Sequence, residues 1–231
     1  NINLDQLLAI NNAMKYPLAY IQGPPGTGKT NTILNTIVTA FFNNMTVLFA
    51  SYNNVPINNV FEKLSSLTYK GKRVAFPVLR LGNQEKVKEC ICYINQLRRE
   101  VHGIKVFSST LDRRKGDRID RAKQLSGRLK EYEEVLDLTE RKETLTQVME
   151  YQERMKNVAT LFHFHTDLQG RQLRNLDEKI QKIGEISERD AMALLDRNED
   201  EFYSYLYYTS AKYIKELESN RFQDLRKILD D

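Results

Sequence analysis

Eight consecutive residues near the start of the chain have the types and the spacing of a phosphate-binding loop. The run Gly-Pro-Pro-Gly-Thr-Gly-Lys-Thr at 23–30 fits the pattern G-x-x-x-x-G-K-[ST]. Its glycines can adopt backbone angles that other residues avoid, so successive N–H groups can turn toward phosphate oxygens. The residues that we expect to bind ATP in this loop are Gly23, Pro24, Pro25, Gly26, Thr27, Gly28, Lys29 and Thr30.

Lys29 and Thr30 are the residues of this loop that we expect to act in catalysis. The Lys29 ammonium would reach the β- and γ-phosphates, and the Thr30 hydroxyl would complete the shell of a bound Mg²⁺. The helix that follows would point the positive end of its dipole at the same anion. The pattern therefore predicts ATP and Mg²⁺ as ligands, with Thr30 as the metal contact.

Short apolar runs around the loop predict the elements that position it. Residues 18–22, 46–51 and 74–81 have the composition of buried strands, and residues 31–42 and 58–67 have apolar side chains at helical spacing. Strand, helix, strand, helix, strand is the order of a parallel α/β sheet. We therefore predict an α/β P-loop fold with a partial parallel sheet.

Motifs before and after the loop point to a family. Residues 3–6 are Asn-Leu-Asp-Gln, and Gln6 lies seventeen residues before Gly23. Residues 52–64 are Tyr-Asn-Asn-Val-Pro-Ile-Asn-Asn-Val-Phe-Glu-Lys-Leu, and Arg-Leu-Gly follows at 80–82. Residues 3–64 resemble the start of the first RecA-like motor domain of superfamily 1 helicases, in the branch that contains the nonsense-mediated decay RNA helicase.

This resemblance implies ligand contacts for several residues. Gln6 would contact adenine, because its amide can both donate to and accept from the N6/N7 edge of the base. Ser51, Asn53 and Asn54 would contact the backbone of single-stranded nucleic acid, either DNA or RNA. Asn54 stands where the family has asparagine, whereas Asn53 and Asn58 stand where it usually has serine and aspartate. The alternative that residues 51–54 only cap the following helix remains open.

The chain changes character after Gly82. All five prolines lie in the first 77 residues, and residues 1–82 carry 7 Lys and Arg against 2 Asp and Glu. Residues 83–231 carry 28 and 29, and narrow apolar stripes within them predict four to six long helices that pair as in coiled coils. We expect breaks between these helices near residues 103–110, 116, 160–170 and 197–200. We expect residues 1–82 to be the N-terminal part of a RecA-like motor domain. Residues 83–231 would be an all-α, partly coiled-coil insertion, to which a protein partner could bind.

Other candidate sites in the helical segment are weaker. Cys90 and Cys92 lack a second pair of zinc ligands, and no carboxylate cluster adjoins His163 and His165. The aromatic residues of 202–213 could stack on bases, but their helical spacing favours core packing. No apolar run approaches the ~18–20 residues that span a bilayer, and the mean hydropathy is −0.56. We therefore expect a cytoplasmic protein with no membrane partner.

A motor that hydrolyses ATP also needs a Walker B carboxylate at the end of a buried strand. The candidates, Asp177-Glu178 and Glu199-Asp200-Glu201, lie in charged, helical surroundings. We therefore expect an N-terminal piece of a longer helicase or translocase, a piece that binds ATP but does not hydrolyse it alone. Two alternatives stay open: a P-loop ATPase of the AAA+ type, or a helical interaction module that nucleotide binding only regulates.

Overall fold

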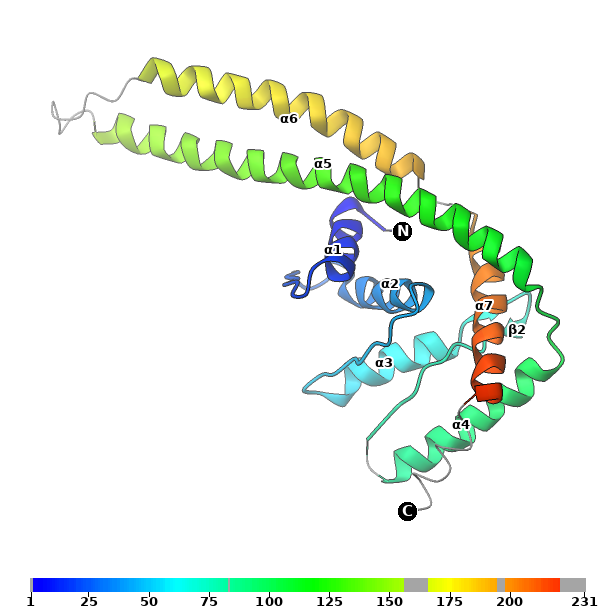
Figure 1. Cartoon of the computed structure of the whole chain (residues 1–231). Helices are drawn as coiled ribbons and strands as arrows, with labels where there is room; N and C mark the ends of the chain where they lie inside the picture. The colour runs from blue at the N-terminus through cyan, green and yellow to red at the C-terminus, as the bar shows by residue number, and fades with distance from the viewer. Residues whose placement is uncertain (1, 83, 156–165, 195–197, 221–231) are drawn as a thin grey trace. The chain divides into compact units, whose positions relative to one another are not determined.

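The computed structural model describes residues 2–82, 84–155, 166–194 and 198–220 (Figure 1). The chain divides into two compact units. The loop unit comprises Tyr20–Ile119 and Asp196–Asp231, and the helical unit comprises Asn1–Ala19 and Asp120–Leu195. The boundary at Gly82 between a motor domain and an insertion stays a prediction.

In the loop unit, two helices follow the order that the sequence predicts. Helix α2 (Lys29–Phe42) confirms the helix expected over 31–42 and ends before Asn44, whose φ of 56° is a left-handed conformation that asparagine tolerates. Helix α3 (Asn54–Ser65) begins earlier than the predicted residue 58. Pro56 therefore falls in the first turn, where its missing N–H costs no hydrogen bond.

The three runs predicted as strands, 18–22, 46–51 and 74–81, contain no strand in the described residues. A strand is stable only when neighbouring strands bond to its N–H and C=O groups. The side chains of Tyr20 and Leu48 are 88% and 87% exposed, so no further layer covers these two runs. The described residues thus contain the helices that were predicted to flank a parallel sheet, but not the sheet itself.

The third run, 74–81, is buried only at its start, and its hydrogen bonds there are local. Val74, Ala75 and Phe76 are at most 2% exposed. The Phe76 N–H donates to the Val74 carbonyl (2.8 Å), and the Val78 N–H donates to the Phe76 carbonyl (2.9 Å). Bonds between residues two apart use N–H groups that a sheet would need for pairing, so the run packs between helices without belonging to a ladder.

A short hairpin that the sequence analysis did not predict precedes this run. Strands β1 (Thr68–Tyr69) and β2 (Lys72–Arg73) pair antiparallel, with Thr68 opposite Arg73. The two turn residues, Lys70 and Gly71, have φ of 49° and 72°. Two positive φ values fit a tight turn that matches the twist of the strands. A lysine in the first turn position gives a weak signal, which is why the turn was missed.

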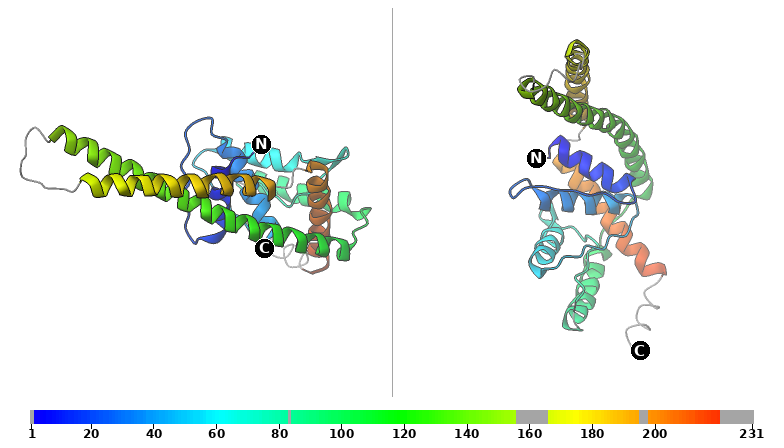
Figure 2. Two further views of the ribbon diagram at one scale, coloured as in Figure 1. Left: turned by 90° about the horizontal axis from the view of Figure 1, so that it is seen from above. Right: turned by 90° about the vertical axis from the view of Figure 1, so that its left-hand side faces the viewer.

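Two helices from beyond residue 82 complete the core of the loop unit. Helix α4 (Gln84–His102) and helix α7 (Glu199–Asn220) lie against each other, and α7 also contacts β1 (Figures 1 and 2). One cluster of buried core side chains consists of Val38, Val60, Leu64, Val74, Phe76, Leu206 and Tyr207. A second cluster, to which α4 contributes, consists of Ala75, Leu97, Val101, Ala211 and Ile214. Phe41 contacts Phe76 edge-on, with ring centres 5.1 Å apart. Core packing of the aromatic run is therefore confirmed for its buried members.

The break predicted within residues 103–110 is confirmed, because α4 ends at His102 and α5 (Ser108–Met155) begins at Ser108. The break predicted at Gly116 is wrong, since α5 continues through it. Residues 108–119 of α5 belong to the loop unit. There the Arg114 guanidinium donates to the Glu201 carbonyl (2.8 Å), which joins α5 to α7.

The helical unit contains α1 (Leu4–Lys15), the rest of α5 and α6 (Thr166–Leu194). Its core consists of Leu4, Leu7, Leu129 and Ala191. The Tyr132 hydroxyl donates to Asp5 Oδ1 at 2.9 Å, which adds a polar contact between α5 and α1. None of the described helices has both the length and the apolar character that a membrane span requires.

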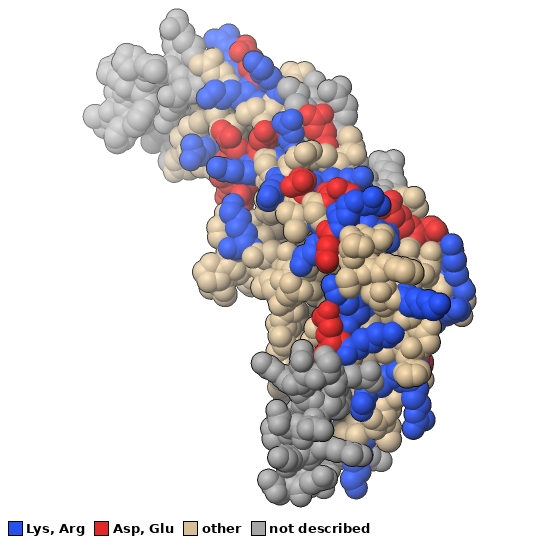
Figure 3. Space-filling model, turned by 45° about the vertical axis from the view of Figure 1, so that its right-hand side comes forward, with Lys and Arg blue, Asp and Glu red and all other residues tan. Residues whose placement is uncertain are grey.

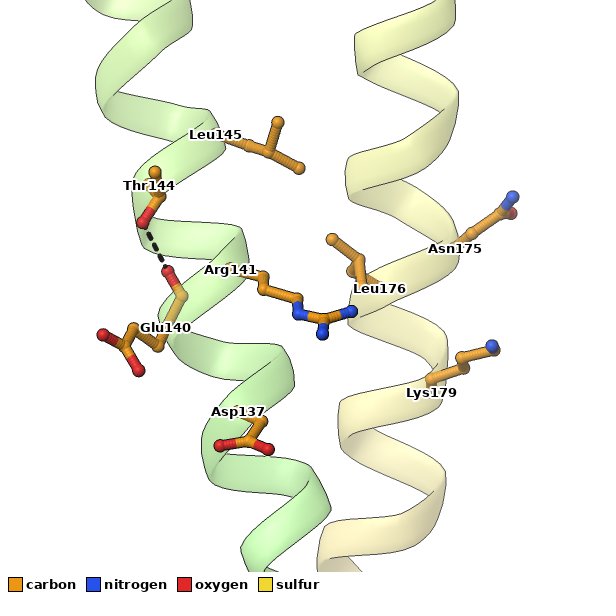
Figure 4. A pocket seen from close by; sticks show the side chains of 8 residues that line it. All are labelled: Asp137, Glu140, Arg141, Thr144, Leu145, Asn175, Leu176 and Lys179. Carbon is orange, nitrogen blue, oxygen red and sulfur yellow. Dashed lines mark hydrogen bonds between the residues drawn. The ribbon is translucent and has the colours of Figure 1, made fainter.

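Helices α5 and α6 lie side by side with a cavity of about 840 Å³ between them (Figure 4). Leu145 and Leu176 supply apolar surface, and Arg141 points from α5 toward α6 (Figure 4). An ion pair between Lys142 and Asp177 also joins the two helices. The cavity is open and its charges are balanced, so its lining alone does not select a ligand.

Candidate phosphate-binding site

The loop at 23–30 has the backbone conformation that its glycines predict. Gly26 and Gly28 have φ of +85° and +79°, a region that L-residues rarely occupy. A Cβ on Gly23 would lie 2.7 Å from Thr27 Oγ1, too close for a real contact. Gly26 and Gly28 are therefore required for their φ angles, and Gly23 is required because a Cβ would not fit there.

Hydrogen bonds within the loop hold it in a tight turn. The Thr27 hydroxyl donates to the Pro24 carbonyl at 2.8 Å. The Lys29 ammonium donates to the carbonyl oxygens of Gly23 and Pro24, each at 2.7 Å. The ammonium thus lies over the loop, where phosphate oxygens could replace these two carbonyls as its acceptors.

The start of α2 lies at the end of the loop. Gly28 is the N-cap residue, and no acidic side chain occupies the first turn. The first N–H groups of a helix have no acceptor within the helix, so those of Lys29 and Thr30 are directed out of its N-terminal end. Because these groups also carry the positive end of the helix dipole, the site favours an anion. The loop and α2 therefore fit a triphosphate.

Gln6 has a local role that the sequence analysis did not predict. Its backbone N–H donates to Asn3 Oδ1 (2.8 Å), and its side-chain Oε1 accepts from the Asn3 N–H (3.3 Å). This reciprocal pair is a capping box at the start of α1. The pattern Asn-x-x-Gln is a signal that could have revealed it. Gln6 belongs to the helical unit, and its contact with adenine stays a prediction.

The residues predicted to contact nucleic acid lie at the start of α3. Ser51, Asn53 and Asn54 are all exposed, and Asn53 is the N-cap residue of the helix. The Asn53 side chain makes no capping hydrogen bond, so capping does not explain its amide. Asn54 instead accepts a hydrogen bond from Arg80 Nη2 at 2.8 Å.

Arg80 forms a cluster with Asn54 and Asn58 of α3, a role that the sequence analysis missed. Its Nε donates to Asn58 Oδ1 at 3.1 Å, and its Nη1 donates to the Leu81 carbonyl. One guanidinium therefore contacts two successive turns of α3. The Arg-Leu-Gly motif at 80–82 was the available signal, but nothing in the sequence placed it beside α3.

A groove lies next to this cluster, between α3 and α4. Its volume is about 750 Å³, and Arg80, Lys86 and Lys88 supply basic groups to its lining. Cys90 also lines it, and burial raises the pKa of the Cys90 thiol. Cys90 is buried and Cys92 exposed, and both are free thiols.

The loop unit is strongly basic along its first stretch. Residues 20–119 carry 15 Lys and Arg against 6 Asp and Glu, a net charge of +9. Figure 3 shows blue Lys and Arg side chains more often than red Asp and Glu over the lower half of the face drawn. The basic character thus continues well beyond Gly82. A surface of this sign favours a polyanion such as nucleic acid.

The acidic candidates for a Walker B position lie on helices, as their surroundings suggested. Asp177 and Glu178 lie within α6, and residues 199–201 form the first turn of α7. Asp200 pairs with Lys70 at 3.9 Å, and Asp177 pairs with Lys142. In the part of the chain that is described, no group of three or more His, Cys, Asp or Glu could hold a metal ion. His163 and His165 lie outside the described residues.

A family model described as an AAA domain matches residues 1–201 of the chain. Parts of the chain are also similar in sequence to known proteins, including these three relatives. The DNA replication ATP-dependent helicase/nuclease JHS1 of Arabidopsis thaliana is 31% identical over 123 residues, which cover 48% of this chain and 9% of the relative. The DNA-binding protein SMUBP-2 of Mus musculus is 32% identical over 91 residues, 39% of this chain and 8% of the relative.

The third relative is the regulator of nonsense transcripts 1 homolog of Drosophila melanogaster. It is 35% identical over 75 residues, which cover 32% of this chain and 6% of the relative. The chain thus aligns with less than a tenth of the length of each of these relatives. No solved structure matched the chain.

Proposed function

The chain belongs to the AAA-domain family, and from this premise we propose that it is the ATP-binding part of a nucleic-acid-dependent helicase or translocase. Within the family it belongs to the superfamily 1 helicases, in the branch that contains the nonsense-mediated decay RNA helicase. The observation that carries the proposal is the conformation of the loop at 23–30. Two positive φ angles and an exposed lysine at the start of a helix together form a cradle for a triphosphate.

Each loop residue has a role in this proposal. The backbone N–H groups of the loop and of the first turn of α2 bind phosphate oxygens. Lys29 exchanges its two carbonyl acceptors for the β- and γ-phosphates, and this exchange orients the triphosphate. The Thr30 hydroxyl would hold the Mg²⁺ that comes with the nucleotide, and this ion would supply positive charge beside the phosphates. Gln6 contacts the adenine base.

A titration with a fluorescent ATP analogue tests this proposal. With Mg²⁺ present, the wild-type chain should bind the analogue, and Lys29→Ala should lower the affinity at least about tenfold, since a hydrogen bond to a charged group is lost. Lys63→Ala removes an exposed lysine from α3 and serves as the matched control. If Lys29→Ala binds as the wild type does, the loop is not the nucleotide site.

We further propose that the 231-residue chain by itself binds ATP but does not hydrolyse it. The acidic candidates lie on helices, and Asp177 and Asp200 pair with lysines, so they lack the strand-end position of a Walker B carboxylate. Release of inorganic phosphate should stay at background level. Steady release that disappears in Lys29→Ala would contradict this part of the proposal.

The second ligand in the proposal is single-stranded nucleic acid, with Ser51, Asn53 and Asn54 as contacts to its backbone. The exposed amides at the start of α3 and the net charge of +9 over residues 20–119 support it. Contacts of this kind position a strand without reading its sequence, so both DNA and RNA should bind. Binding of a protein partner to the helices after Gly82 stays a prediction.

A further inference from the structure

The Arg80 side chain forms an unusual arrangement with two asparagines of α3. Asn54 and Asn58 are four residues apart, so their side chains lie on the same face of the helix. Arg80 Nη2 donates to Asn54 Oδ1 at 2.8 Å, and Arg80 Nε donates to Asn58 Oδ1 at 3.1 Å. One planar group therefore contacts both amides at once.

The chemistry of the guanidinium fixes which way both amides point. Arginine has only hydrogen-bond donors, so each amide must turn its oxygen toward it. The Nδ2 groups of Asn54 and Asn58 consequently face away, and both residues are exposed. An amide without such a partner could present its oxygen instead, and an oxygen repels the phosphates of a nucleic acid.

We propose that Arg80 is a positioning residue that orients the amides of Asn54 and Asn58, so that their N–H donors meet phosphate oxygens of a single-stranded nucleic-acid backbone. The inference rests on the proposed function, which supplies the nucleic acid. It adds Asn58 as a contact and assigns Arg80 a role that acts through both asparagines.

The residue type at position 58 matters for the same reason. The Asn58 amide accepts from Arg80 Nε through its oxygen and keeps its Nδ2 donor for a phosphate, whereas an aspartate there would have no donor to offer. Glu62 and Glu89 line the adjoining groove, but the Glu89 carboxylate bonds to Lys86 Nζ at 2.6 Å.

Anisotropy of labelled oligo-dT and oligo-U with the 231-residue chain tests the inference. Arg80→Ala and Asn54→Ala should each lower the affinity about tenfold, the effect of losing a hydrogen bond to a charged group. The double variant should be little weaker than either single variant, because Arg80 acts through the asparagines. Arg99→Ala removes an exposed arginine from α4 and controls for loss of charge alone.

Two conservative variants separate orientation from charge. Arg80→Lys keeps the charge but cannot donate from a planar fork to both amides, so it should bind less tightly than the wild type. Asn58→Asp keeps an oxygen for Arg80 but replaces the Nδ2 donor by a carboxylate oxygen, so it should weaken binding. Thermal unfolding of each variant shows whether the fold is retained.

Three results would overturn the inference. In the first, the loss of affinity of the double variant equals the product of the losses of the two single variants. In the second, Arg99→Ala weakens binding as much as Arg80→Ala. In the third, Arg80→Lys binds as the wild type does. In each case the wild-type chain still binds single strands, so the proposed function survives. A wild-type chain that binds neither oligonucleotide overturns both the inference and the nucleic-acid part of the proposed function.

Discussion

Replacing Gly26 by alanine isolates the backbone requirement of the phosphate-binding loop. Gly26 has a φ of +85°, and a Cβ added there would meet no atom within 4 Å. The substitution therefore causes no steric clash with the rest of the chain. What remains is the cost of holding an L-residue in the left-handed region, about 1–2 kcal/mol.

Because Gly26 is exposed, this cost should affect the affinity for ATP more than the free energy of unfolding. An exposed loop can relax locally, so the free energy of unfolding of the loop unit should change little. ATP binding requires the original conformation, so the cost should appear in the affinity. A cost of about 1–2 kcal/mol corresponds to a loss of roughly 5- to 30-fold.

The assay is a titration with a fluorescent ATP analogue, accompanied by thermal unfolding. Gly26→Asn should lose less affinity than Gly26→Ala, because asparagine tolerates positive φ better. Gly127→Ala is the matched control: it lies within α5, and its Cβ also meets no atom within 4 Å. This control should keep its ATP affinity. Wild-type affinity in Gly26→Ala would refute the argument that the loop binds ATP in this conformation.

The remaining predictions concern the loop unit and its thiols. Leu206→Ala should lower the free energy of unfolding by about 2–5 kcal/mol, because this core side chain is only 1% exposed; denaturant unfolding measures it. Glu216→Ala, at an exposed position of the same helix, should stay within about 0.5 kcal/mol. Maleimide at neutral pH should modify Cys92 before Cys90, since burial raises the pKa of the Cys90 thiol and lowers its thiolate fraction. Mass spectrometry of digested samples would show the order, and equal rates would contradict it.

The loop and the helices could be predicted because their signals are local. The glycine, lysine and threonine positions of 23–30 specify a turn and the start of a helix, and the structure has both. Apolar spacing predicted α2, and the break predicted over 103–110, which begins at Gly103, fits the end of α4 at His102. These signals depend on hydrogen bonds within one segment, so a single sequence contains the information needed.

The strands and the Arg80 cluster could not be predicted in the same way. An apolar run such as 46–51 has the composition of a strand, but a strand exists only where a partner supplies hydrogen bonds. The described residues supply none to this run, and Leu48 stays exposed. Arg80 and Asn54 are 26 residues apart, and their contact depends on how residues 74–81 pass beside α3. Only the folded chain brings such pairs together.

The position of α7 connects residues 199–220 to the phosphate-binding loop. Leu206 and Tyr207 pack into the same core as Val38 of α2 and Val60 of α3. Helix α2 carries Lys29 at its first turn, so its position depends on that core. Helix α7 therefore contributes to the support of the phosphate-binding loop, although more than 150 residues separate the two in the sequence. A destabilising change such as Leu206→Ala should consequently reduce ATP binding through the fraction of folded chain, with the affinity of the folded fraction unchanged.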